Sequence, residues 1–448
     1  MNDMSTVKAA PASPQQAVDS SVLGLAPRPV TVEETGLDAL FIQELILKQF
    51  LESGVLDLLQ LVTSMALAGS LLESVLAHIK EEGLVEVKGQ SDTSGALRYA
   101  LTDRGRAGAV EAMSRDGYVG PAPVTLQEYT RIVEAQSTRN HDLTRAQVHA
   151  AFSDTVIRST LLDQLGPAMH SGKAMFVYGD AGTGKSFISR RFARLLGQHI
   201  FVPHAIAVQS NVIQFFDPSY HHPTQKLGQS PGLCLNSGHD PRYVLCERPL
   251  VITGGELQLG MLELQYDGVT RCYRAPLQLL ANNGMMLIDD LGRQHVAPVE
   301  LFNRWIVPLE ERHDYLALKN GQHIQVPFDS QLAFSTNLNP LDLADEAFLR
   351  RIGYKIHFDT PTEEEFSAIW QQECAGRGLD YDIRHLRFLL QDLYAKEQRT
   401  LLPCHPRDLI GLAQDYNRYQ AKTGISEEAL QWAWDNYFVQ LSEQEKRQ

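Results

Sequence analysis

The chain has 448 residues, which is long enough for about three domains. Of these residues 44% are hydrophobic, which is enough to form packed cores. Its formal net charge of −14 excludes a global electrostatic attraction to nucleic acid or to an anionic membrane. The five irregularly spaced cysteines exclude a regular disulfide framework, and no signal peptide or long uninterrupted apolar run is visible, so we expect a cytoplasmic protein without a membrane partner.

The first predicted segments are an arm and a small domain. Residues 1–35 are rich in Ala, Pro, Ser and Gln, a composition typical of a disordered arm. Over residues 36–112, apolar residues at helical spacing predict three helices, and the runs LVEV and LRYALT predict two short strands around a polar turn. Three helices followed by a two-stranded wing indicate an α+β winged-helix domain.

A winged helix can serve DNA or protein binding, and its charges favour protein. The second helix of the helix pair, residues 70–82, carries Lys80 beside Glu73, Glu81 and Glu82, so phosphates would be repelled from it. The wing adds Lys88 and Arg98, a modest positive charge. We therefore expect a protein-interaction or self-association role ahead of DNA binding.

A linker, residues 113–142, leads into a larger α/β domain predicted at 143–360. Apolar runs of strand length, such as AMFVY, GMMLIDD and QLAFSTN, are separated by stretches of helical spacing. Buried runs that alternate with helices predict a parallel sheet. After Pro361 the apolar spacing is helical to the end, which predicts an all-α domain at 361–448.

The segment GDAGTGKS matches the phosphate-binding pattern G-x-x-x-x-G-K-[ST], between a predicted strand and a predicted helix. Glycines let backbone N–H groups turn inward around a β-phosphate, and the helix N-terminus adds partial positive charge. Lys185 would reach the β- and γ-phosphates, and the Ser186 hydroxyl would help to hold Mg²⁺. The residues predicted to bind ATP here are Gly179, Asp180, Ala181, Gly182, Thr183, Gly184, Lys185 and Ser186.

A second motif places two carboxylates at the end of an apolar strand. In MMLIDD these are Asp289 and Asp290. The first can hold the Mg²⁺ shell together with Ser186, and the second can polarise a water for in-line attack on the γ-phosphate. This pair predicts a nucleotide-hydrolysing site.

Taken in order, these and three further motifs resemble those of the AAA+ ATPases over residues 143–440. GDAGTGKS is similar to Walker A, and MMLIDD to Walker B. FSTN ends at Asn337, the sensor-1 position, and CHPRDL resembles the sensor-2 motif with Arg407. DEAFLRRI resembles the segment with the arginine finger, for which Arg350 and Arg351 are both candidates.

The resemblance implies a P-loop AAA+ parallel-sheet core with a C-terminal all-α lid. It implies ATP and Mg²⁺ as cofactors, Asp290 and Asn337 as the residues that activate and position water, and Arg407 as a γ-phosphate contact. In AAA+ rings the finger comes from the neighbouring subunit, so a homo-oligomer, expected to be a hexameric ring, is also implied. Most AAA+ hydrolases have Glu where this chain has Asp290, which puts fast turnover in doubt but not nucleotide binding.

The segment before the third strand motif resembles the MoxR-like and enhancer-activator branch. YLALKNGQHIQVPF, with Asn320-Gly321 at its tip, predicts a β-hairpin. Residues 209–274 are predicted to be insertions. They contain residue types that bind zinc, but without paired zinc spacing, so we expect no structural metal. These residues are His221, His222, Cys234, His239, Cys246 and Cys272.

The function predicted from the sequence is a ring-forming ATPase that couples ATP hydrolysis to remodelling a protein partner. The alternative is a DNA-associated, ATP-dependent regulatory switch that uses the winged helix and hydrolyses slowly. A structural ATP-bound scaffold is a third hypothesis. The acidic composition favours a protein partner over DNA.

Overall fold

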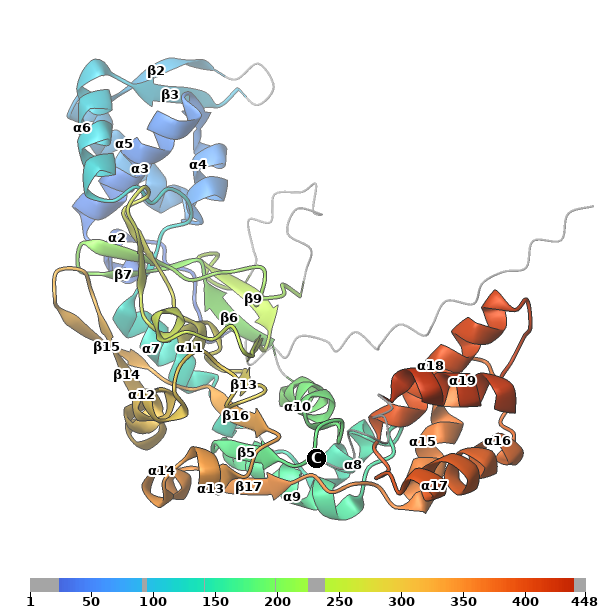
Figure 1. Ribbon diagram of the computed structural model, residues 1–448. Helices are drawn as coiled ribbons and strands as arrows, with labels where there is room; N and C mark the ends of the chain where they lie inside the picture. The colour runs from blue at the N-terminus through green and yellow to red at the C-terminus, as the bar shows by residue number, and fades with distance from the viewer. Residues whose placement is uncertain (1–23, 91–94, 141, 198, 225–237, 439–448) are drawn as a thin grey trace, which may run out of the picture. The chain divides into compact units, whose positions relative to one another are not determined.

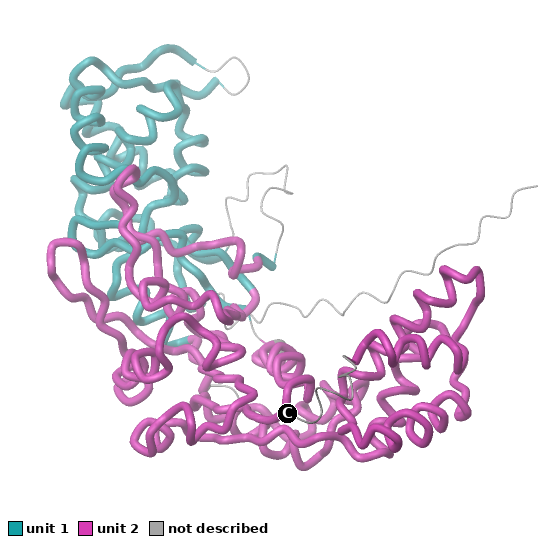
Figure 2. The backbone as a smooth tube through the Cα atoms, in the orientation of Figure 1, with its two compact units in different colours: residues 1–135, 199–212, 223–246 teal, residues 136–198, 213–222, 247–448 magenta. Residues whose placement is uncertain are grey.

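The computed structural model describes residues 24–90, 95–140, 142–197, 199–224 and 238–438. The chain divides into two compact units, coloured separately in Figure 2. Unit 1 comprises residues 1–135, 199–212 and 223–246, and unit 2 comprises residues 136–198, 213–222 and 247–448. Each unit is therefore assembled from segments that are separated in the sequence.

Unit 1 contains the three helices and two strands predicted for residues 36–112, in the predicted order. The elements are α2 Val32–Thr35, α3 Ala39–Ser53, β1 Leu56–Asp57, α4 Leu58–Met65, α5 Gly69–Glu81, β2 Val85–Gln90, β3 Leu97–Leu101, α6 Asp103–Arg115, β4 Val124–Thr125 and α7 Leu126–Ala135. Among them, α2, β1, α6 and β4 were not predicted. β3 lies between β1 and β2 and pairs with both in an antiparallel manner. The identification of this part as a winged helix stays a prediction.

Local signals explain where these helices begin. Asp57 and Gln60 form a reciprocal capping box at the start of α4. Helix α2 falls within the residues predicted to form an arm, with Thr31 as its N-cap, while residues 1–23 of that arm lie outside the described residues. Inside the unit, the buried ammonium of Lys48 lies 2.7 Å from a carboxylate oxygen of Asp116, which joins α3 to the end of α6.

Later segments of the chain return to unit 1. β6 His199–Pro203 and β7 Ala205–Val208 lie in them, with most of β9 Tyr243–Glu247. β7 pairs in parallel with β4, and the buried guanidinium of Arg242 contacts the carbonyl oxygens of Thr35 and Pro123 at 3.2 and 3.3 Å. These contacts explain why segments expected in the α/β domain cluster with the N-terminal part.

Unit 2 is built on a five-stranded parallel sheet, with strand order β10-β13-β16-β5-β17. Strands β13, β16, β5 and β17 are labelled in Figure 1. The strands are β5 Met175–Tyr178, β10 Leu250–Thr253, β13 Met285–Ile288, β16 Gln331–Thr336 and β17 Tyr354–His357. All four neighbouring pairs are parallel. The predicted α/β fold with a parallel sheet is confirmed. β10 lies inside the segment predicted to be an insertion, because a four-residue run without a helical neighbour leaves little pattern to detect.

Both faces of this sheet are covered. Along β13, Met286 and Ile288 pack into one core with α11 and α12, while Met285 and Leu287 pack into a second core with α8, α9 and α10. This alternation is what the two-residue period of a strand requires when helices lie on both sides. The helices are α8 Arg145–Ala151, α9 Ser159–Ser171, α10 Lys185–Ala193, α11 Leu277–Leu280 and α12 Pro298–Glu311.

The predicted hairpin is present in unit 2. Strands β14 His313–Ala317 and β15 His323–Pro327 pair in an antiparallel manner, and Gly321 at the tip has φ +82°. The remaining elements before the C-terminal region are η1 Thr138–Asn140, η2 Arg194–Leu196, β8 Asn211–Gln214, η3 Leu259–Leu262, β11 Gln265–Asp267, β12 Cys272–Arg274, α13 Pro340–Leu343 and α14 Glu346–Arg351.

The C-terminal region is helical, as predicted, and has its own core. Its elements are α15 Glu363–Gly376, α16 Ile383–Arg387, the π-helix η4 Phe388–Tyr394, α17 Ala395–Glu397, α18 Cys404–Tyr419 and α19 Glu427–Tyr437. Trp370, Leu409 and Trp434 are buried in this core. Thr362 and Glu365 form a capping box that starts α15 directly after the predicted boundary.

Across the described ranges, no single helix is long and apolar enough to cross a membrane. Helices α4 and α5 together have the required length and composition, but they meet at a bend of 115°.

Candidate active site

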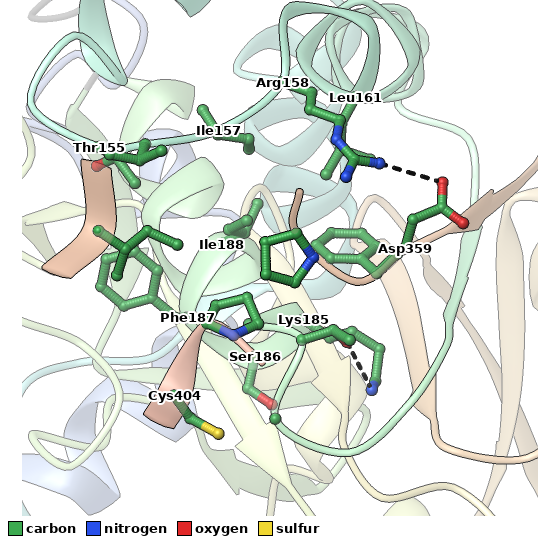
Figure 3. Close-up of a pocket in the computed structure, with 18 of the residues that line it drawn as sticks. Thr155, Ile157, Arg158, Leu161, Lys185, Ser186, Phe187, Ile188, Asp359 and Cys404 are labelled. Atoms are coloured by element: carbon green, nitrogen blue, oxygen red, sulfur yellow. Dashed lines mark hydrogen bonds and ion pairs between the residues drawn. The ribbon is translucent and has the colours of Figure 1, made fainter. Parts of the chain in front are cut away.

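The phosphate-loop motif lies between β5 and α10, as predicted. The carboxyl ends of the parallel strands β5, β13 and β16 meet at one edge of the sheet. Asp289, Asp290 and Asn337 follow two of these strands, so their side chains line the same cavity as Lys185, with a volume of about 980 Å³. The helical C-terminal region contributes Pro403, Cys404 and Arg407 to the lining of the cavity. Cys404 is labelled in Figure 3.

The loop has a conformation that requires glycine. Gly179, Gly182 and Gly184 have φ values of +141°, +84° and +89°. A Cβ atom on Gly179 would lie 2.4 Å from the carbonyl oxygen of Phe358, and one on Gly182 would lie 2.6 Å from the sulfur of Cys404. The glycines therefore allow both the positive φ and the close approach of neighbouring segments.

Lys185 is buried at the start of α10, and polar oxygens surround its ammonium group. Its Nζ donates at 2.8 Å to the carbonyl oxygens of Gly179 and Asp180 and to Oδ1 of Asn337. Burial lowers the pKa of Lys185, and the carboxylates of Asp289, Asp290 and Asp180 oppose that shift. The lysine is thus a positive charge held at the rim of the loop, where a phosphate could take over its hydrogen bonds.

Asn337 connects the lysine to the second carboxylate of the Asp289–Asp290 pair. Its Nδ2 lies 3.4 Å from Oδ1 of Asp290, while its Oδ1 accepts from Lys185. Asp290 has φ +49°, in the left-handed region that few non-glycine residues adopt, and its exposed carboxylate lines the cavity. The structure therefore brings together three predicted residues, Lys185, Asn337 and Asp290, from three different motifs.

The predicted arginines separate into two groups. Arg407, in the first turn of α18, lines the cavity, and Asp408 accepts from its Nε at 2.8 Å and raises its pKa. Arg350 and Arg351 lie at the end of α14 and are not among the described residues that line the cavity. Arg351 instead donates to Glu310 at 2.6 Å. Of the three predicted arginines, Arg407 is therefore the one that lines the cavity in the described part of the chain.

Several cavity residues were not found from the sequence. An apolar wall is formed by Val156, Ile157, Phe187 and Ile369. Arg158, just before α9, donates to the two oxygens of Glu365 at 2.6 and 2.8 Å and lies 3.6 Å from Asp359 (Figure 3). No local motif marks Arg158, because its partner is 207 residues away.

The histidines and cysteines of the predicted insertion have ordinary structural partners where they are described. The ring of His221 lies 3.0 Å from the carbonyl oxygen of Leu280, and burial lowers its pKa to about 4. Cys246 and Cys272 are buried, and Cys234 lies outside the described residues. In the described part of the chain, no three residues of the metal-binding types gather around one point.

Comparisons with known proteins identify similarity in the fold. Residues 362–436 match a family described as Domain of unknown function (DUF8689). No curated protein matches the chain. The chain is similar to the Thermotoga maritima RuvB Holliday junction branch migration motor, at 12% identity over 65% of this chain and 74% of that one, with a TM-score of 0.38. It is also similar to Brucella abortus NtrX in complex with ADP, at 12% identity over 76% of this chain and 68% of that one, with a TM-score of 0.40. At these identities and TM-scores the likeness carries no argument about function, which rests on the residues of the site.

Proposed function

We propose that unit 2 is an ATPase of the AAA+ type, which binds MgATP in the cavity at the carboxyl ends of the strands and hydrolyses it to ADP and phosphate. The observation that carries this proposal is the connected set Lys185, Asn337 and Asp290. A phosphate-binding lysine lies 2.8 Å from an amide that in turn lies 3.4 Å from a carboxylate free to face water. These are the groups needed to bind a γ-phosphate, position a water and accept its proton.

The residues present fit MgATP. The loop contributes backbone N–H groups and the start of α10, both suited to phosphate. Ser186 and Asp289 line the cavity and supply the hydroxyl and carboxylate oxygens that Mg²⁺ prefers. When bound there, Mg²⁺ would neutralise charge on the phosphate oxygens. The apolar wall formed by Val156, Ile157, Phe187 and Ile369 is suited to the base.

The chemistry of this chain's own residues follows from their positions. Asn337 would hold a water beside Asp290, whose carboxylate would accept a proton as the water attacks the γ-phosphorus and the bond to the β-phosphate oxygen breaks. Lys185 would stay on the β- and γ-phosphate oxygens throughout. Arg407 would contact the γ-phosphate from α18 after releasing Asp408.

The proposal includes a homo-oligomer, most simply a head-to-tail ring. Charge on the transferred phosphoryl group calls for a guanidinium, and Arg350 and Arg351 lie outside the cavity of their own chain. A neighbouring subunit could deliver one of them to the cavity of the next. The β14–β15 hairpin supports the MoxR-like branch within this proposal, and the substrate would be a protein that a ring of such subunits remodels.

Mixing two inactive variants tests delivery across an interface. We expect Asp290→Asn, which keeps both arginines, and the double variant Arg350→Ala/Arg351→Ala, which keeps Asp290, to lose turnover separately. Mixed one to one, about a quarter of the sites should combine an intact Asp290 with a neighbour's arginine if the subunits assemble head to tail at random. Phosphate release measures the recovery, with Arg384→Ala on the lid surface as a matched arginine control. A mixture no more active than its separate components would contradict the proposal.

The structure adds little support for the alternative function of a DNA-associated switch. The exposed face of α5 carries Glu73 and Glu81 beside Lys80, and the wing residue Lys88 is paired with Glu86 at 2.6 Å. Among the described residues of α5 and the wing, this leaves few unpaired positive charges that would approach phosphates. We therefore propose that unit 1 binds protein or other copies of the chain.

A further inference from the structure

The turn that follows Asp290 is held by one side chain that no predicted motif includes. Gln294 donates from Nε2 to the carbonyl oxygens of Asp289 and Asp290, at 3.1 and 3.3 Å. The same nitrogen lies 3.2 Å from the carbonyl oxygen of Gly254, just after β10. Its Oε1 accepts from the backbone N–H of Gly292 at 2.8 Å. One amide thus contacts both peptide oxygens of the Walker B pair, the turn after them and the end of the neighbouring strand.

The backbone at Asp290 needs such support. A φ of +49° costs a non-glycine residue free energy, and such strained positions persist only where their surroundings hold them. From the other side, Leu291 donates to Ser335 at 2.8 Å and accepts from the hydroxyl of Thr336 at 2.7 Å. Leu291 joins the turn to β16, while Gln294 joins it to the end of β10. The direction of the Asp290 side chain depends on this backbone conformation.

We propose that Gln294 is a positioning residue for hydrolysis: by holding the peptide of Asp290 in the left-handed conformation, it keeps that carboxylate beside Asn337. The inference rests on the proposed ATPase function. An aspartate reaches one methylene less far than a glutamate, so a small displacement of its backbone moves the carboxylate away from the water position. Gln294 acts on the rate of the chemical step and contributes no group to the binding of ATP.

Two substitutions of Gln294 distinguish the hydrogen bonds that its amide donates from the space that its side chain fills. Gln294→Ala removes the amide, whereas Gln294→Glu keeps its size and its acceptor but replaces the donor by a charge facing three carbonyl oxygens. We expect kcat to fall about 10- to 100-fold in both, because small misplacements of reacting groups have effects of that order. The matched control is Gln420→Ala, an exposed glutamine at the end of α18.

The readouts are kcat and KM from phosphate release, the Kd of a fluorescent ATP analogue, and the melting temperature. The inference predicts that both Gln294 variants have a reduced kcat, while their Kd for the analogue and their melting temperature equal those of the Gln420→Ala control. Wild-type kcat in Gln294→Glu would overturn it, and so would a parallel loss of kcat, affinity and melting temperature, which would show a structural role only. The proposed function would survive both results. Wild-type protein that binds the analogue without any turnover would overturn the proposed function itself, and this inference with it.

Discussion

Replacing Lys185 by alanine should weaken nucleotide binding by about 100-fold or more. In the proposed site the lysine supplies the cationic hydrogen bonds to the β- and γ-phosphates, and each bond to a charged group contributes roughly 1.5–3 kcal/mol. Loss of two such bonds weakens binding by about 100-fold or more, since about 1.4 kcal/mol corresponds to a tenfold change. The remaining loop keeps its glycines, so the fold should persist. Titration with a fluorescent ATP analogue measures the effect directly.

The matched control is Lys396→Ala, a lysine on the surface of the C-terminal region that pairs with Asp392 at 3.2 Å. It should bind nucleotide as the wild-type protein does. Tight ATP binding by Lys185→Ala would contradict the assignment of the site, because no other cation of the loop could replace this one.

Replacing Asp290 by asparagine should stop turnover while ATP still binds. Asparagine has the same size, tolerates the left-handed backbone at φ +49°, and keeps an oxygen that can meet Asn337 at the observed 3.4 Å. It lacks the basic carboxylate, and general-base catalysis is worth about 10²- to 10⁴-fold. We therefore expect kcat to fall about 100-fold or more, with the Kd for an ATP analogue nearly unchanged.

Asp415→Asn, on the exposed surface of α18, is the control for an aspartate-to-asparagine change. Phosphate release and analogue binding should both be normal in it. Undiminished turnover in Asp290→Asn would show that another group accepts the proton, and the assignment of Asp290 as the base would then be wrong.

The site residues that could be predicted from the sequence are those that belong to contiguous sequence motifs. The loop at Gly179–Ser186 and the carboxylates after β13 follow from spacing, strand length and the residue types that phosphate and Mg²⁺ require. Asn337 was found in the same way, as a polar residue directly after an apolar strand. The parallel sheet and the helical C-terminal region were equally visible, because continuous apolar runs of strand length mark strands that are buried on both faces, and helical apolar spacing persists over many turns.

The parts that were missed depend on contacts between distant residues. Arg158 forms hydrogen bonds with Glu365, which lies 207 residues further along the chain. Cys404 lies against Gly182 because α18 packs over the loop. Gln294 acts through carbonyl oxygens, which carry no residue-specific signal. The segments 199–212 and 223–246 join unit 1 through β4–β7 pairing and through Arg242, and local composition does not encode either contact.

ATP turnover per subunit, measured over a wide range of protein concentrations, tests the central claim most directly. If the cavity of unit 2 hydrolyses ATP with an arginine from a neighbouring subunit, phosphate release per subunit should rise steeply with concentration and then saturate. Negligible phosphate release at every concentration, from protein that demonstrably binds ATP, would contradict the claim that this chain is an ATPase.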